Sequence, residues 1–118
     1  MSFTEILKEV VTATDGALGA LVVGLDGIPV EEYVKNSEMD IQSMTVEYSS
    51  LLKEIEKGSQ SAQMGSTKEV TVTAEKAIIM MRRLNDEYFL VLIVKPEGNF
   101  GKGRFLLRMS APHLLKEF

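Results

Sequence analysis

The segment VTVTAEKAIIMMRRLNDEYFLVLIV, residues 70–94, decides the fold, because it holds three strand patterns in a row with no helix between them. Val70–Thr73 alternates apolar and polar residues, Ala77–Met81 is denser in apolar residues, and Tyr88–Val94 is apolar throughout. Asn85-Asp86-Glu87 supplies a turn between the last two. Consecutive strands joined by short turns pair antiparallel, so the segment predicts a three-stranded meander and not a parallel sheet.

A second hairpin precedes this meander. Ala17–Leu25 consists of small and β-branched residues and predicts a strand that can be buried on both faces. Asp26-Gly27 and then Ile28–Val34 follow, and both turn residues tolerate positive φ, which predicts a hairpin. Pro29 has no N–H to donate, so we expect its strand at or near an edge of the sheet.

The ends of the chain predict two helices. Residues 2–14 place apolar residues at helical spacing behind Ser2, with Glu5 in the capping-box position. Asn99 is the expected cap of the last helix, and Pro112 is expected to kink or restart it. The apolar side of that helix is expected at Phe105, Leu106 and Met109.

The longest predicted helix is Ile41–Lys57, which follows a polar linker at residues 35–40 and has Asp40 as its expected cap. Its apolar residues fall within a stripe about 100° wide that has to be buried; they are Ile41, Met44, Tyr48, Leu51, Leu52 and Ile55. The opposite side carries Val46 between Ser43 and Ser50, with Lys57 further on. Small side chains let another backbone come close, so this side is either a second contact surface or a solvated one.

Together these elements predict the order α-β-β-α-β-β-β-α, an α+β fold whose five-stranded antiparallel sheet carries helices on its faces. At 118 residues, we expect residues 1–118 to form a single domain. The composition, 45% hydrophobic and 25% charged, is typical of a folded globular protein.

Composition also excludes several classes of protein. The absence of cysteine excludes disulfides and thiolate chemistry and favours a cytoplasmic location. The apolar run Ala17–Leu25 is interrupted by glycine and too short to span a membrane, and no basic leader precedes an apolar block, so we expect neither membrane insertion nor a signal peptide. Residues 1–66 hold 11 acids and 4 bases, and residues 67–118 hold 6 acids and 9 bases. With a net charge of −4 and scattered bases, nucleic acid is not an expected partner.

Catalytic, metal-binding and cofactor-binding sites are not expected. His113 is the only histidine and there is no cysteine, so neither a two-histidine metal site nor a cysteine nucleophile paired with a histidine can be assembled. Gly98–Gly103 superficially resembles a phosphate-binding loop but lacks its hydroxyl residue and spacing. We interpret it as a flexible start of the last helix, with anion binding there as the alternative. Arg82-Arg83 and Arg104/Arg108 are either solvated or a source of an arginine finger.

The remaining feature is an interaction geometry. Val70–Thr73 follows a polar loop and begins the meander, which makes it a candidate sheet edge, and exposed edges invite pairing. If two copies pair through this strand, their long helices lie side by side in a twofold dimer. The residues predicted at the dimer interface are Ser43, Val46, Ser50, Val70, Thr71 and Val72.

Four segments resemble the Roadblock/dynein light chain family, and specifically its bacterial MglB-like members. They are residues 16–27 (GALGALVVGLDG) behind the first helix, Val46–Ile55 in the long helix, Leu84–Leu90, and Gly98–Gly101 at the start of the last helix. The likeness covers nearly the whole chain. These motifs are architectural, so they indicate fold more specifically than activity.

The resemblance implies an αββαβββα Roadblock-type sandwich that dimerises through its third strand and long helix. Val70 and Val72 then lie at the seam, and Ile41–Lys57 supplies helix pairing and part of a platform that faces a small Ras-like GTPase. To this partner-binding platform we assign Gln42, Ser49, Lys53, Glu56 and Lys57.

The same resemblance implies that the chain is not itself an enzyme and needs no cofactor. The MglB-like branch activates its GTPase, so a GTPase-activating homodimer is the first expectation, and a heterodimer with a related chain stays open. One alternative is a passive scaffold of the same fold. Another is a small-molecule sensor built around Gly98–Gly103. No catalytic residue of the family is carried over to this chain.

Overall fold

The computed structural model describes residues 2–35 and 39–118, so half of the predicted linker at residues 35–40 lies outside the described residues. Within these ranges the element order is the predicted one. The elements are α1 (Phe3–Ala13), β1 (Ala17–Gly24), β2 (Pro29–Val34), α2 (Ile41–Ser61), β3 (Glu69–Thr73), β4 (Ile78–Arg83), β5 (Tyr88–Val94) and α3 (Phe100–Leu115).

The strands form one five-stranded sheet in the order β2-β1-β5-β4-β3, and every neighbouring pair is antiparallel. This confirms the predicted α+β fold and both hairpins. The central pair, β1 with β5, joins strands that are far apart in the sequence, with Ala20 opposite Leu92 and Leu21 opposite Val91. Strands β2 and β3 form the two edges, as the Pro29 and Val70–Thr73 patterns predict.

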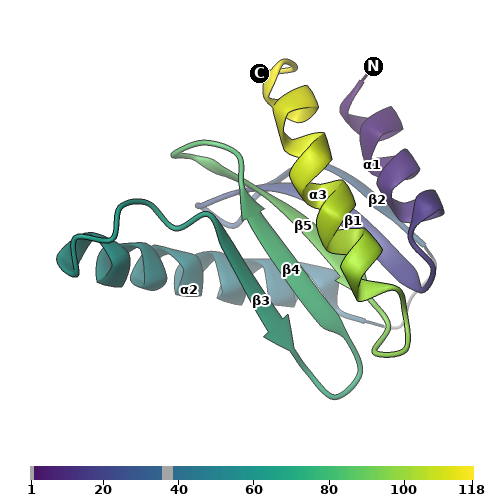
Figure 1. Cartoon of the computed structure of the whole chain (residues 1–118), viewed down its shortest axis with the longest axis horizontal. Helices are drawn as coiled ribbons and strands as arrows, with labels where there is room; N and C mark the ends of the chain where they lie inside the picture. The colour runs from purple at the N-terminus through teal and green to yellow at the C-terminus, as the bar shows by residue number, and fades with distance from the viewer. Residues whose placement is uncertain (1, 36–38) are drawn as a thin grey trace.

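Helices α1 and α3 cover one face of the sheet, and α2 covers the other (Figure 1). Because side chains alternate along a strand, β1 sends Ala20 and Val22 into the core under α1 and α3, and Leu21 and Val23 into the core under α2. Strand β5 divides its side chains in the same way, which explains why its sequence is apolar throughout.

Short-range contacts fix the ends of the helices as the sequence predicts. Ser2 and Glu5 form the capping box of α1, Asp40 accepts a hydrogen bond from the Ser43 N–H, and Asn99 accepts one from the Lys102 N–H. In the β1–β2 turn, Gly27 has a φ of 86°, a conformation that favours glycine.

Two predicted helix faces are wrong at single residues, whereas the other members of the α2 stripe and Leu106 on α3 are buried or half-buried as predicted. On α2 the buried residues are Thr45, Ser49 and Leu52, while Leu51, expected in the buried stripe, is 44% exposed. On α3 the buried residues are Gly103, Leu107, Ala111 and Leu114, whereas Phe105 and Met109 are about half exposed. Small residues on both helices, such as Ser49 on α2 and Gly103 on α3, lie against the sheet and allow a close approach there.

Helix α3 also continues through Pro112 to Leu115, so the predicted restart at that proline does not occur. Proline costs a helix one backbone hydrogen bond, from its own position to the carbonyl four residues earlier. Here Ala111 and Leu114 on either side are buried, so packing holds the last turn in place.

Candidate functional site

The edge strand β3 presents a row of backbone groups that its own sheet does not use. The Arg83 N–H donates to the Lys68 carbonyl and the Ala74 N–H donates to the Ala77 carbonyl, so both ends of the β3–β4 ladder are hydrogen-bonded pairs. In an antiparallel ladder such pairs alternate. The backbone groups of Glu69, Thr71 and Thr73 therefore point away from β4, toward the open side of the edge.

The side chains of β3 divide between the two faces. Val70 and Val72 are half-buried and pack in the core under α2. Thr71 is exposed on the opposite face. A copy of this strand paired to the edge would extend the valine row on the α2 face, where it would remove further apolar surface from water.

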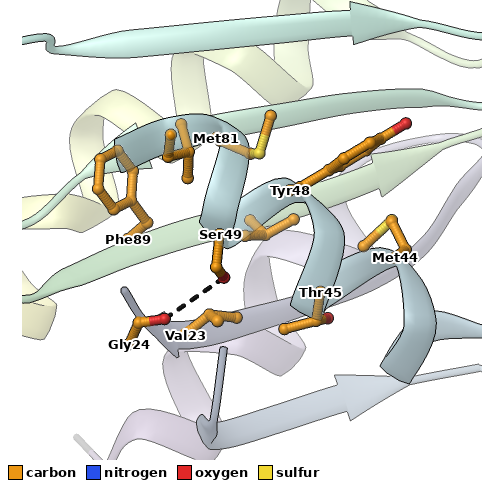
Figure 2. Close-up of a pocket in the computed structure, with 10 residues that line it drawn as sticks. Val23, Gly24, Met44, Thr45, Tyr48, Ser49, Met81 and Phe89 are labelled. Carbon is orange, nitrogen blue, oxygen red and sulfur yellow. Dashed lines mark hydrogen bonds between the residues drawn. The ribbon is translucent and has the colours of Figure 1, made fainter. Parts of the chain in front are cut away.

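Helix α2 packs on the sheet through two small polar residues as well as through Leu52 and its other apolar side chains. Thr45 and Ser49 face the sheet, and the Ser49 hydroxyl donates to the Gly24 carbonyl at 3.4 Å (Figure 2). The Thr45 hydroxyl donates to the Ile41 carbonyl within the helix. The cavity left beside them is about 10 Å³, which is too small for an organic ligand. This region is a helix–sheet contact and not a small-molecule site.

The structure changes the predicted partner platform at one residue. Ser49 is only 4% exposed and faces its own sheet, so it does not lie on the surface that a partner would meet. Gln42, Lys53 and Lys57 are exposed. Glu56 is half-buried, and its Oε2 accepts a hydrogen bond from the Thr67 N–H at 2.9 Å. Its role is to hold α2 to the segment that leads into β3.

Hydrogen bonds lower the pKa values of two carboxyl groups on α2. The Thr67 N–H, followed by the Gln60 side-chain amide, lowers the pKa of Glu56. The Ser43 N–H and then its hydroxyl lower the pKa of Asp40 at the start of the helix. Donors to a carboxylate favour its charged form, so both groups stay ionised around neutral pH.

The outer side of α2 is exposed, as the pattern of small residues predicts. Ser43, Val46 and Ser50 all face solvent, and Val46 is 53% exposed. Figure 1 shows that the C-terminal half of α2 continues past β3 at the edge of the sheet. Leu51, in the middle of α2, is exposed as well. The platform of α2 and the open edge of β3 thus lie next to each other.

Two of the three glycines of Gly98–Gly103 serve close packing. A Cβ on Gly98 would lie 2.7 Å from the Asp15 carbonyl oxygen, and a Cβ on Gly103 would lie 2.9 Å from Leu92 Cδ2. The loop is therefore built to bring α3 down onto the sheet, which agrees with its interpretation as the start of the last helix. Its anion-binding alternative gains no support from these contacts.

The histidine and the arginines singled out in the sequence lie on the surface or in ion pairs. His113 is exposed near the end of α3. Within residues 2–35 and 39–118, acidic and histidine side chains nowhere gather in a group of three that could hold a metal ion. Arg82 and Arg104 both pair with Glu69, and Arg83 pairs with Asp86. No described helix is long and apolar enough to cross a membrane.

Comparisons with known proteins show which solved structures share this fold. No protein-family model matches the sequence, and no curated protein matches it either. The fold matches the gliding protein MglB from Thermus thermophilus with a TM-score of 0.86 at 14% identity, over 97% of this chain and 86% of that chain. It matches a Roadblock/LC7 domain from Streptomyces avermitilis with a TM-score of 0.77 at 12% identity, over 98% of this chain and 99% of that chain.

The third solved structure is also related in sequence. MglC from Myxococcus xanthus is 40% identical over 100% of both chains, with a TM-score of 0.72. The chain belongs to the Roadblock/MglB-like family. Within this Roadblock fold, the identity to MglC far exceeds the identity to MglB, so MglB is related to this chain through its fold and MglC through its sequence as well.

Proposed function

We propose that this Roadblock-family chain is a homodimeric, cytoplasmic regulator of a small Ras-like GTPase, of the GTPase-activating kind. The observation that carries the proposal is the open β3 edge beside the exposed, overhanging α2. Pairing of two β3 edges joins two sheets and brings two α2 helices together, and only the pair offers a continuous platform. Ser43, Val46, Ser50, Val70, Thr71 and Val72 form the proposed dimer interface.

Activation by this platform would not use an arginine finger. Helix α2 contains no arginine, and Arg82, Arg83 and Arg104 are each paired with a carboxylate of this chain. The platform would instead bind one arrangement of the partner's own switch segments more tightly than the others, which shifts their population toward the hydrolytic arrangement. The chain itself performs no chemistry in this scheme.

A passive scaffold of the same fold is the second candidate. Two observations favour it. Helix α2 contains no arginine, and the sequence identity is 40% to MglC but only 14% to MglB from Thermus thermophilus. A scaffold would bind the GTPase or another partner on the same platform and leave hydrolysis unchanged.

Single-turnover GTP hydrolysis separates the two candidates. A Ras-like GTPase captured with the tagged chain is loaded with GTP and followed with and without an excess of the dimer. We expect an acceleration of roughly 10- to 100-fold, below the effect of an inserted arginine. A complex that forms without acceleration would favour the scaffold, and failure to bind any Ras-like GTPase would contradict both.

Matched charge reversals locate the binding face. Lys53→Glu changes the proposed platform on α2, whereas Lys102→Glu makes the same change on α3, on the other face of the sheet. We expect only the first to weaken binding of the GTPase. Equal effects of both would show that the α2 face is not the platform.

A further inference from the structure

A second surface lies on the face of the sheet opposite α2. Between the first half of α3 and the outer strands β3 and β4 there is a recess of about 370 Å³. Its polar lining consists of Arg82 from β4, Glu69 from β3, and Arg104 and Arg108 from α3. The proposed GTPase platform uses none of these side chains.

The recess is cationic because one carboxylate faces three guanidinium groups. Glu69 Oε1 accepts from Arg104 Nε at 2.7 Å, and Glu69 Oε2 accepts from Arg82 Nη1 at 3.1 Å. The Glu69 side chain is only 13% exposed, so this largely buried carboxylate holds the two arginines in place. The lining keeps two positive charges in excess, in a protein whose net charge is −4.

Two of these arginines present donors to solvent. The Arg104 side chain is 59% exposed, and Glu69 takes up one of its N–H groups in the bond from Nε. Arg108 lies 6.0 Å from the ring centre of Phe105. Guanidinium groups bind carboxylates in a planar, two-point geometry, so the recess can accept carboxylates of another molecule.

The rest of the lining of this recess is mainly apolar. Phe105 and the less exposed Phe100 line it, and Met109 lies one turn further along α3, where Phe105 and Met109 are both about half exposed. Phe105 and Met109 are two of the three residues that the sequence pattern assigned to the apolar side of α3. Within Phe100–Leu115 there is no acidic residue. Exposed aromatic side chains beside arginines are enriched at protein interfaces.

We propose that this recess binds an acidic segment of a protein partner in which large apolar residues accompany the carboxylates. The carboxylates would meet Arg104 and Arg108, and an apolar side chain would pack against Phe105. The phenylalanine walls give a free inorganic anion nothing to contact, and a hollow between a helix and two strands does not lie flat on a bilayer. Together with the α2 platform, the recess would allow one dimer to hold two different partners on opposite faces.

The probe for this proposal is a fluorescein-labelled peptide of twelve residues that repeats Glu-Glu-Leu-Phe, measured by fluorescence anisotropy. Its comparators repeat Gln-Gln-Leu-Phe, which lacks the charge, and Glu-Glu-Ser-Ser, which lacks the apolar side chains. We expect the probe to bind at least about 10-fold more tightly than either comparator at low salt, and to weaken as salt is added. Equal binding of a comparator would overturn the proposed two-part recognition.

Variants of the full chain place the peptide in the recess. Arg108→Glu reverses a charge of the lining that holds no ion pair with Glu69, and we expect about a 10-fold loss of probe affinity. Phe105→Ser removes an apolar wall, with an expected loss of about fivefold. Lys102→Glu is the matched control, since it reverses a charge on α3 outside the recess and should change affinity by less than about twofold. Circular dichroism checks that each variant is folded.

Three results would overturn the proposal. They are an absence of probe binding, a loss with Lys102→Glu as large as that with Arg108→Glu, and Arg108-dependent binding to phosphatidylserine vesicles in place of the peptide. All of these measurements use the chain without a GTPase. Failure of the recess proposal therefore leaves the proposed GTPase regulation untouched, and the reverse also holds.

Discussion

Replacement of Thr71 by proline should separate the proposed dimer while leaving each protomer folded. Thr71 is the middle one of the three β3 residues whose backbone groups point away from β4. Proline is tolerated on an edge strand when the N–H that it removes faces outward. The ladder between β3 and β4 therefore keeps its hydrogen bonds in the variant. The proline ring takes the place of the Thr71 side chain on the exposed face.

The size of the effect follows from the twofold symmetry of the pair. In an antiparallel pair centred on Thr71, the two copies exchange two N–H···O bonds, and proline deletes both donors. Each lost bond costs about 1 kcal/mol net. The two proline rings, one from each protomer, also crowd the facing strand. The total loss of dimerisation free energy is then roughly 3 kcal/mol, which raises the dimer Kd about 100-fold.

Sedimentation velocity over a concentration series measures this shift against the 13.1 kDa protomer. Thr71→Val is the matched control, because valine has a similar shape and keeps the N–H, and its dimer should dissociate as the parent does. Val72→Pro is the opposite control, since the Val72 N–H faces β4 and its loss should destabilise the protomer itself. A folded Thr71→Pro protein with an unchanged dimer Kd would show that this edge is not the seam.

Three further predictions concern α2 and α3. In thermal unfolding, Gly101→Ala should raise the stability by about 0.5–1 kcal/mol because its Cβ would meet only Asn99 Oδ1 at 4.0 Å, whereas Gly103→Val should lower it by about 1–3 kcal/mol by crowding Leu92; equal shifts would contradict the close approach of α3. Ser50→Trp should weaken the dimer in sedimentation by crowding the paired helices, and an unchanged affinity would assign that side of α2 to another partner. The lowered pKa of Glu56 means that its contribution to stability is present above the unfolded pKa and is lost as pH falls through the lower folded pKa; the Thr67 amide resonance should report this titration by NMR, and a titration that persists in Glu56→Gln would assign it elsewhere.

Local chemistry made much of this fold predictable. The Ser2 and Glu5 capping box, the Asp40 and Asn99 caps and the Asp26-Gly27 turn depend on residues within a few positions of each other. Each appears in the structure where the sequence predicts it. The run of small and β-branched residues at Ala17–Leu25 likewise predicted a strand that can be buried on both faces, and β1 is buried in this way.

The candidate site was predicted less completely. The edge position of β3 and the exposure of Ser43, Val46 and Ser50 agree with the sequence analysis, but Ser49 lies under the helix. The sequence of α2 alone could not show that Ser49 is more buried than Leu51. Burial of the Ser49 hydroxyl costs little only because it donates to the Gly24 carbonyl of β1, a residue far away in the sequence. The cationic recess escaped notice as well, since Glu69 and Arg104 are 35 positions apart in the chain.

The sequence by itself determined which segments are helices and strands, where each helix begins, and that neighbouring strands pair antiparallel. These properties arise from backbone preferences and from contacts between residues close in the chain. The tertiary structure alone decided the pairing of β1 with β5, the side of α2 and of α3 that meets the sheet, and the gathering of three arginines around Glu69. A helix settles on the face that allows the closest packing against its neighbours, and that fit depends on side chains brought together only when the whole chain has folded.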